Sequence, residues 1–362
     1  MATLHIFNPE HDIALAYNLA NFTAPHAARQ LRGDIGFLPA LWAEDDDVVM
    51  TDNEETAAGA WKKIRSRLHL LWGEDRMKHV NPRFVTWKSV KAASVDSVEP
   101  WGWDAALVAQ LKRKGIAGSL LPSEEKIAEI RLLSHRRTAT RLLPELLMAG
   151  TVGEAFECSQ QDEVEALLGK HNKVVMKAPW SSSGRGLRFL DVARTPFSMQ
   201  AGWFFNTVDQ QGSVMVEPYY NKVKDFGMEF SVDENGETHY VGLSLFHTVN
   251  GIYRGNIIAT ERRKMEMMGN YLPVDLLTEV KQRICDKLGS IMRGKYVGPL
   301  GVDMMVVARE DAKGFLLHPC VEVNMRRTMG HVAIALTPDD DDIVRVMRIE
   351  LTDHYKLKIN KL

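Results

Sequence analysis

The chain has 362 residues, of which 45% are hydrophobic and 25% are charged, and its formal net charge is −2. This composition excludes an intrinsically disordered chain, and the length suggests two or three domains. A nearly neutral chain has no long-range attraction for nucleic acid or for an anionic membrane, so we expect neither as a partner.

The cysteines and the N-terminus indicate the compartment. Cys158, Cys285 and Cys320 are scattered, which argues against a disulfide framework and against a structural zinc site. The first residues lack the basic start and the apolar stretch of a signal peptide. No apolar run approaches the ~20 residues that a membrane helix needs. The sequence therefore predicts a cytoplasmic protein.

The first part of the chain predicts a small α/β unit. Residues 3–7 and 48–50 are short apolar runs typical of buried strands. Asp104 can cap a helix, and Gly115 stands where that helix would end in a left-handed residue. Strands that alternate with helices indicate an α/β layer, and we place this domain at residues 1–122.

The middle of the chain changes from helices to strands. Ser123, followed by two acidic residues, can start a helix, and a second helical stretch contains Pro144. Residues 174–177 and 187–190 predict two strands on either side of a loop of small residues. We expect a second unit over residues 123–213.

The last part of the chain, residues 214–362, predicts a larger sheet. Its strands alternate in polarity, and apolar residues at helical spacing indicate helices between them. The expected elements are a hairpin turn at 233–236, strands at 300–307 and 315–324, a long helix at 274–291 and a closing helix at 343–351.

Lys177 ends a predicted strand and precedes a loop of small residues, Ser181-Ser-Ser-Gly-Arg-Gly186. This combination suits phosphate, because the ammonium group neutralises charge and glycine lets backbone amides approach the oxygens. The loop matches neither the P-loop nor the glycine pattern of dinucleotide-binding folds. A plain surface hairpin is the alternative interpretation.

Three oxygen-bearing side chains stand on the two strands predicted near residue 310. Asp303 lies in an apolar strand, where a charge is costly unless it is paired or bound to a metal. Glu322 and Asn324 are two residues apart, so a strand presents both on one face. A turn between the strands would bring these oxygens together, and magnesium prefers such ligands. The alternative is an ordinary strand pair with a solvated polar face.

Three further residues have an expected position around this site. Arg326 would share the face of Asn324 if the chain stays extended, and its guanidinium suits a γ-phosphate or an acyl-phosphate. Glu217 precedes a proline at the end of a strand, where the backbone would form a hinge at the adenine. Glu229 lies on a later strand, where a carboxylate would accept hydrogen bonds from ribose. Each glutamate taken singly is more typical of a structural or solvated position.

The order of these pieces resembles the ATP-grasp superfamily over residues 134–326. A basic residue before a helix, Arg136 or Arg137, is followed by the lysine and its lid loop, the hinge strand, a glutamate and the metal set. The ending Glu-Val-Asn-Met-Arg after an aspartate strand is the most specific part. The chain departs from the family in having arginine before the helix and only two glycines in the lid.

The resemblance implies an ATP-grasp fold of mixed α/β (α+β) class, with ATP between two subdomains and an N-terminal α/β domain before them. It implies Mg²⁺, as one ion or two and replaceable by Mn²⁺, on Asp303, Glu322 and Asn324. The catalytic residues that it implies are Lys177, Arg254 and Arg326. The nucleotide contacts that it implies are Arg136, Arg137, Lys177, Ser182, Ser183, Gly184, Gly186, Glu217 and Glu229.

The resemblance also implies a reaction. ATP phosphorylates a carboxylate, and an amine or a similar nucleophile then displaces phosphate, so that ADP is released. Substrates of this kind are small molecules or peptides, and homodimers are frequent in the family. Two other interpretations remain open: a phosphotransferase that stops at phosphorylation, and a nucleotide-binding protein without turnover.

Two places are candidates for the acceptor substrate. The cluster Asn8-Pro-Glu10-His11-Asp12 follows the first predicted strand, and the carboxyl ends of strands bind ligands in α/β domains. A capped turn is the alternative there. Arg254 would meet an anionic substrate, a position that the resemblance favours, although surface arginines usually have no such role.

Overall fold

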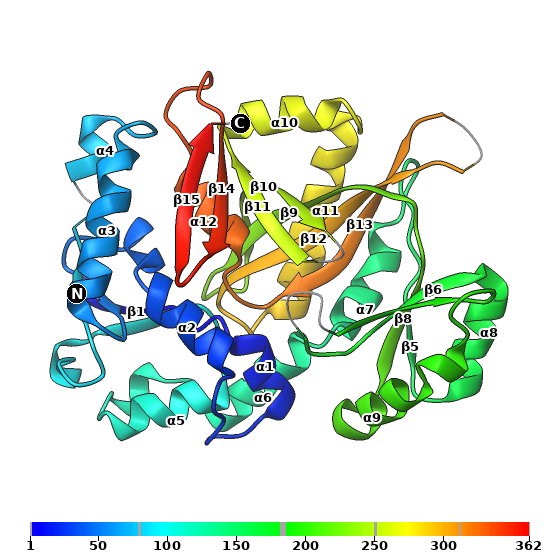
Figure 1. The fold of residues 1–362 in the computed structure, drawn as a ribbon, viewed down its shortest axis with the longest axis horizontal. Coiled ribbons are helices and arrows are strands. Elements are labelled where there is room, and N and C mark those ends of the chain that lie inside the picture. Colours follow the sequence, from blue (N-terminus) through cyan, green and yellow to red (C-terminus); the bar gives the residue numbers. More distant parts are fainter. Residues whose placement is uncertain (1, 79–80, 182–185, 250–251, 311–312, 362) are drawn as a thin grey trace.

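The computed structural model describes residues 2–78, 81–181, 186–249, 252–310 and 313–361. Within these ranges the chain forms three β-sheets with helices packed between and around them (Figure 1). Each sheet comes from a different stretch of the chain, and we name them the N-terminal sheet, the small sheet and the large sheet in that order.

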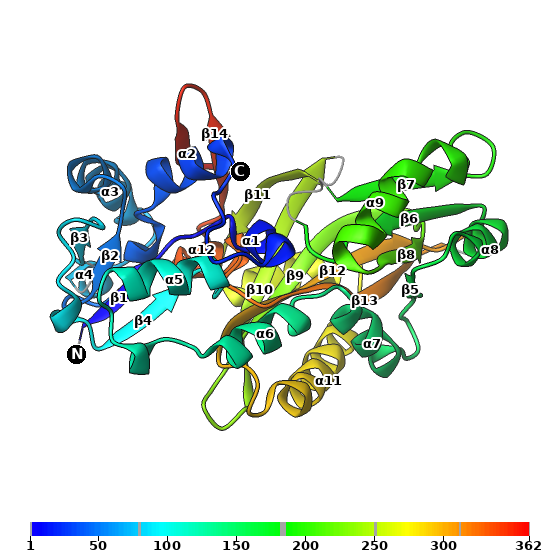
Figure 2. The same ribbon diagram turned by 90° about the horizontal axis from the view of Figure 1, so that it is seen from below.

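The N-terminal sheet is parallel, with the strand order β3-β2-β1-β4. Its strands are β1 (Thr3–Ile6), β2 (Val48–Met50), β3 (Arg83–Val85) and β4 (Ser97–Pro100). Its helices are α1 (His11–Tyr17), α2 (His26–Ile35), α3 (Glu54–Leu68), α4 (Glu74–Lys78) and α5 (Ala105–Arg113). Val49 packs under α2 and α3, whereas Val48 packs under α5 on the opposite face. Figure 2 shows α5 lying over β1 and β4 of this sheet. The α/β layer predicted from the sequence is therefore confirmed.

The small sheet is antiparallel, with the strand order β5-β8-β6-β7. Its strands are β5 (Phe156–Cys158), β6 (Lys173–Lys177), β7 (Leu187–Asp191) and β8 (Val214–Pro218). Helices α8 (Gln161–His171) and α9 (Ala201–Gln211) bury Val164 and Phe204 against it. Since β8 pairs with β5 and β6, this sheet extends past the expected unit boundary at 213, and the domain limits stay a prediction.

The large sheet is antiparallel, with the strand order β13-β12-β9-β10-β11-β14-β15. Its strands are β9 (Lys222–Val232), β10 (Thr238–Val249), β11 (Ile252–Ile258), β12 (Gly298–Ala308), β13 (Phe315–Asn324), β14 (Arg345–Leu351) and β15 (Tyr355–Lys361). The helices of this part are α6 (Glu124–Leu133), α7 (Arg137–Leu146), α10 (Glu261–Gly269), α11 (Val274–Met292) and α12 (Met329–Ala335). No helix among the described residues is long and apolar enough to cross a membrane.

The two faces of the large sheet differ in what covers them. Helices α7 and α11 pack on one face, where Met228, Val302 and Val323 are buried with them. We call the other face of β9, β12 and β13 the open face; it carries polar side chains, and α12 lies over its β10 side. Because successive side chains of a strand point to opposite faces, the apolar residues of these strands face the core and the polar ones face the open side.

Several predicted elements are confirmed, and one is wrong. Asp104 caps α5 by accepting a hydrogen bond from the Leu107 backbone N–H at 2.9 Å, and the hairpin turn has Gly236 at a φ of 81°. The closing helix predicted at 343–351 is strand β14, paired with β11 and β15. The acidic residues before it suggested a helix start, but the available sheet edge decided the conformation, and β15 was not predicted.

Candidate functional site

Three predicted oxygen ligands lie side by side on the open face of the large sheet. Asp303 on β12 stands opposite Glu322 on β13, and Asn324 stands opposite Gly301. Directly opposite residues of antiparallel strands share a face. The Asn324 side-chain amide donates a hydrogen bond to Asp303 Oδ2 at 3.1 Å. The structure therefore brings the three together, and their role as metal ligands stays a prediction.

Asp303 is part of an acidic group with Glu322 and Glu229, and it has no ion pair of its own among the described residues. Burial and the nearby carboxylates of Glu322 and Glu229 raise the pKa of Asp303 to about 8. A buried carboxylate crowded by like charges either takes up a proton or binds a cation. Because hard oxygen donors and surplus negative charge suit a divalent ion, the residues present fit magnesium.

Glu229 on β9 belongs to the same acidic group. It is 2% exposed, and its Oε2 lies 3.0 Å from His331 Nδ1. That nitrogen accepts a hydrogen bond from the Thr328 backbone N–H at 3.1 Å, and Glu229 Oε2 has no hydrogen-bond partner among the described residues. A Cβ on Gly301 would lie 2.5 Å from this oxygen, so the close approach requires glycine. The expected contact of Glu229 with ribose stays a prediction.

Lys177 at the end of β6 forms a buried ion pair with Glu217 on β8. The distance from Lys177 Nζ to Glu217 Oε2 is 2.6 Å, and the two side chains are 9% and 8% exposed. The sequence assigned these residues to phosphate and to the adenine hinge, and in the structure they neutralise each other. A ligand that contacts Lys177 must therefore share it with the Glu217 carboxylate.

Arg136 connects the lid loop to the acidic group. One terminal nitrogen of its guanidinium donates to the Ala178 carbonyl at 2.6 Å and to Ser181 Oγ at 2.7 Å. The other donates to Glu322 at 2.9 Å. Arg136 thus joins the loop after β6 to β13, which places the small sheet and the large sheet at one junction.

The remaining predicted nucleotide contacts differ in position. Arg137 pairs with Glu157 on β5 at 2.5 Å rather than with the acidic group. Gly186 is buried, and its carbonyl accepts a hydrogen bond from the Ala178 N–H at 2.8 Å, which closes the base of the lid loop. Ser182, Ser183 and Gly184 lie outside the described residues.

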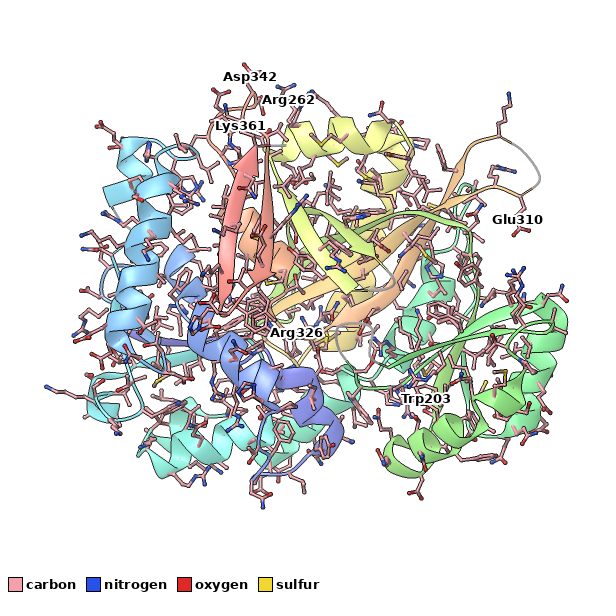
Figure 3. All side chains as sticks on the ribbon, viewed as in Figure 1. Trp203, Arg262, Glu310, Arg326, Asp342 and Lys361 are labelled. Atoms are coloured by element: carbon pink, nitrogen blue, oxygen red, sulfur yellow. The ribbon has the colours of Figure 1, made fainter. Side chains whose placement is uncertain are left out.

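Two arginines were predicted to be catalytic with Lys177, and the structure places them differently. Arg254 on β11 is exposed and has no ion pair with another described residue. Arg326 is held by Asp12 through hydrogen bonds of 2.9 and 2.7 Å, and it also donates to Asn324 Oδ1 at 3.0 Å. Figure 3 shows Arg326 near the middle of the molecule, beside α1.

The chain does not stay extended to Arg326, which was the condition for Arg326 to share the face of Asn324. β13 ends at Asn324, and the Arg326 backbone N–H donates back to the Asn324 carbonyl at 2.9 Å. The side chain nevertheless returns to Asn324, because Asp12 anchors it. Burial alone would raise the pKa of Asp12, but the Arg326 charge and its hydrogen bonds hold that pKa well below its usual range. Arg326 is therefore a charged group at the edge of the site.

Sequence reasoning missed the pairings that assemble the site. The ion pairs Arg136–Glu322 and Asp12–Arg326 join residues 186 and 314 positions apart. No local pattern carries such information. Asp12 was singled out only as part of a polar cluster after the first strand, and Ser181 only as part of the loop.

Comparisons with known proteins identify the fold. No protein-family model matches the sequence, and no curated protein matches it. Among solved structures, N5-carboxyaminoimidazole synthetase from Staphylococcus aureus complexed with ADP is similar, with a TM-score of 0.50 and 13% identity over 97% of this chain and 82% of that one. That synthetase has the ATP-grasp fold. The chain has the ATP-grasp fold.

Two further structures with this fold are equally similar. One is the biotin carboxylase domain of the Hydrogenobacter thermophilus 2-oxoglutarate carboxylase, with a TM-score of 0.50 and 12% identity over 96% of this chain and 74% of that one. The other is biotin carboxylase from Campylobacter jejuni, with a TM-score of 0.50 and 12% identity over 96% and 75% of the two chains. The ATP-grasp fold predicted from the residue pattern is thereby confirmed, and at this identity the likeness concerns the fold alone.

Proposed function

We propose that this protein is an ATP- and magnesium-dependent ligase. It would phosphorylate a carboxylate of a small molecule or peptide, pass the acyl group to an amine or similar nucleophile, and release ADP. The observation that carries the proposal is the meeting of Lys177, Arg136 and the acidic group of Asp303 and Glu322 at the junction of the small and large sheets. Cations for phosphate and oxygens for a metal are what phosphoryl transfer requires.

The metal ligands would be Asp303, Glu322 and Asn324. The raised pKa of Asp303 and the unpartnered oxygen of Glu229 support a cation at this place, because the nearby cations offset only part of the negative charge. Magnesium, as one ion or two, supplies charge neutralisation to the phosphates when it is bound, and manganese has the same ligand preference.

The nucleotide would lie across the same junction. Arg136 and Lys177 would contact phosphates, with Arg137 and the lid residues Ser182, Ser183, Gly184 and Gly186 beside them. Glu217 would lie at the adenine hinge and Glu229 at the ribose. Arg326 would meet the transferred phosphoryl group, since its side chain already contacts Asn324 at 3.0 Å, and Arg254 would meet the anionic substrate.

The similar structures support a bound nucleotide by what they hold. The Staphylococcus aureus synthetase is complexed with ADP, and the Hydrogenobacter thermophilus domain is a dimer in complex with MgADP and bicarbonate. By analogy we propose ATP and Mg²⁺ as cofactors and a homodimer as the assembly. From the sequence we propose the cytoplasm as the compartment.

The test is ADP release from magnesium-ATP, measured across paired pools of carboxylates and amines. We expect release that needs one member of each pool and that falls at least about 100-fold in Asp303→Ala and Glu322→Ala. The exposed residue Asp209 on α9 gives the matched control, since Asp209→Ala should leave release unchanged. Release that needs a single acceptor would indicate a phosphotransferase. Bound ATP without release in any pool would indicate a nucleotide-binding protein and would refute the ligase.

A further inference from the structure

A cavity of about 240 Å³ lies in the N-terminal unit, away from the residues assigned to ATP. Ile6 and Met50, the last residues of β1 and β2, line it, so the cavity stands at the carboxyl ends of the parallel strands. Residues before and within α1, α2 and α5 form its walls. Parallel sheets bind ligands at this end, because strand ends and helix starts leave a crevice there.

The inner part of the cavity is acidic. Glu10 is 8% exposed, and its Oε2 has no hydrogen-bond partner among the described residues. Its other oxygen pairs with Arg32 at 2.5 Å. Burial, together with the nearby Asp104 carboxylate, raises the pKa of Glu10, and burial also raises the pKa of Asp104. Two buried carboxyl groups, Glu10 and Asp104, thus line the inner part of the cavity.

The single arginine of this inner part does not balance its charge. Arg32 is shared, because its Nε also lies 3.5 Å from Asp52 Oδ1, and Asp52 lines the cavity as well. Arg32 thus pairs with both Glu10 and the exposed Asp52, and the buried Asp104 adds a third carboxylate to the lining. Asn8 donates to Asp104 at 3.1 Å, which leaves the net charge unchanged. A buried excess of negative charge of this kind favours a cationic ligand group.

The mouth of the cavity has the opposite character. Arg29 and Arg113 line it, and both are exposed. Arg29 forms no ion pair with another described residue, and Arg113 donates only to the Ala109 carbonyl of its own helix, at 3.3 Å. Phe22 and Trp87, both partly buried, give the wall an aromatic lining. The cavity is thus polarised, with negative charge inside and positive charge at the entrance.

We propose that this cavity binds a small zwitterion, a free amino acid or a dipeptide. The ligand's ammonium group lies beside the Glu10 and Asp104 carboxyl groups at the inner end, and its carboxylate faces Arg29 and Arg113 at the mouth. The volume suits such a ligand, because pockets for larger, drug-sized molecules measure roughly 300–1,000 Å³. A nucleotide is disfavoured, since its phosphates would meet the inner carboxylates.

The position of Glu10 connects this cavity to the ATP-grasp site. Glu10 lies two residues before Asp12, and Asp12 holds Arg326. One turn of the chain thus carries a ligand-facing carboxylate on one side and the anchor of Arg326 on the other. The binding proposal does not depend on ligase activity. If both hold, this ligand provides the amine class that the ligase requires.

The test measures binding to the full chain by calorimetry and by the shift of the melting temperature, without ATP. The probes are the standard amino acids and dipeptides. For any probe that binds, its N-acetyl form removes the ammonium group and its methyl ester removes the carboxylate. We expect at least one probe to bind, N-acetylation to weaken it at least about tenfold, and esterification to weaken it less.

Variants separate the two ends of the cavity. Glu10→Gln should weaken the free probe at least about tenfold, whereas Glu55→Gln, an exposed glutamate on α3, should leave binding unchanged. Because Glu10→Gln also alters the ion pair with Arg32, a second variant is needed that leaves the buried residues unchanged. Arg29→Gln combined with Arg113→Gln changes only exposed side chains, and it should weaken the free probe but not its methyl ester.

Three outcomes would overturn the proposal: no binding by any probe, equal binding of the N-acetyl form, or a mouth variant that weakens the ester as much as the free acid. Failure of the ligase proposal would look different, since it concerns ADP release and leaves these binding constants untouched.

Discussion

The small sheet and the large sheet meet at the candidate site, yet they balance their buried charges differently. On the small sheet, Lys177 and Glu217 form a closed pair at 2.6 Å, with no partner required from outside. On the open face of the large sheet, Asp303 has a pKa near 8 because burial and two further carboxylates surround it. The buried charges of the small sheet neutralise each other without a ligand, whereas those of the large sheet favour a bound cation.

The largest expected effect comes from opening the closed pair. Lys177→Met leaves the Glu217 carboxylate buried without a partner, so we expect the free energy of unfolding to fall by about 3–5 kcal/mol. The measurement is chemical denaturation with and without the substitution. Combining Lys177→Met with Glu217→Leu should recover most of the loss, because the uncompensated charge is then removed.

A matched surface pair provides the control for that experiment. Lys287 and Glu145 lie 2.5 Å apart, but their side chains are 46% and 55% exposed. Solvent screens such a pair, so Lys287→Met should cost about 0–1 kcal/mol. Equal losses at the two lysines would show that the Lys177–Glu217 pair is not buried in solution, and the contrast between the sheets would disappear.

The open face predicts a change of the opposite sign. Without magnesium, Asp303→Asn should raise the free energy of unfolding by about 2–3 kcal/mol near pH 7.5, because it removes a buried acid that stands beside two further carboxylates. The folded-state pKa of about 8 lies above the unfolded value near 3.9, so this group destabilises the protein progressively as pH rises from about 4 to 8.

Magnesium should stabilise the wild-type protein relative to Asp303→Asn, which is the more stable of the two without the metal. The metal should raise the melting temperature of the wild-type protein and of Asp209→Asn, but not of Asp303→Asn. A destabilised Asp303→Asn without metal, or an equal response of all three proteins to magnesium, would mean that the open face is not a cation site.

How far the sequence predicted this contrast depends on the range of the contacts. Asp303, Glu322 and Asn324 could be placed together because strand alternation and one short turn govern all three. Strand β14 was mistaken for a helix, since seven residues of mixed polarity gain their conformation from β11 and β15. The pairing of Lys177 with Glu217 needed the order of strands in the small sheet, which no local pattern specifies.

The smallest expected effect concerns His318, which lies on β13 close to the closed pair. The ring is fully buried, and neither nitrogen has a hydrogen-bond partner among the described residues. Burial and the Lys177 charge lower the pKa of His318 to about 3. Its folded-state pKa is thus below the unfolded value near 6.5, so the unfolded chain takes up a proton first as pH falls.

Stability should therefore be lost on the acid side, in a window that begins near pH 6.5. Between pH 7 and pH 5 this one histidine should cost about 2 kcal/mol of unfolding free energy, measured by denaturation at the two pH values. His318→Gln should reduce that pH dependence, whereas His26→Gln, at an exposed position, should not. Because the Lys177 charge contributes to the lowered pKa of His318, Lys177→Met should raise that folded-state pKa toward the unfolded value. The acid-side loss of stability should then be smaller and should end at a higher pH. An unchanged pH profile in His318→Gln would mean that the His318 ring is accessible to solvent. It would contradict the burial of the residues around the Lys177–Glu217 pair.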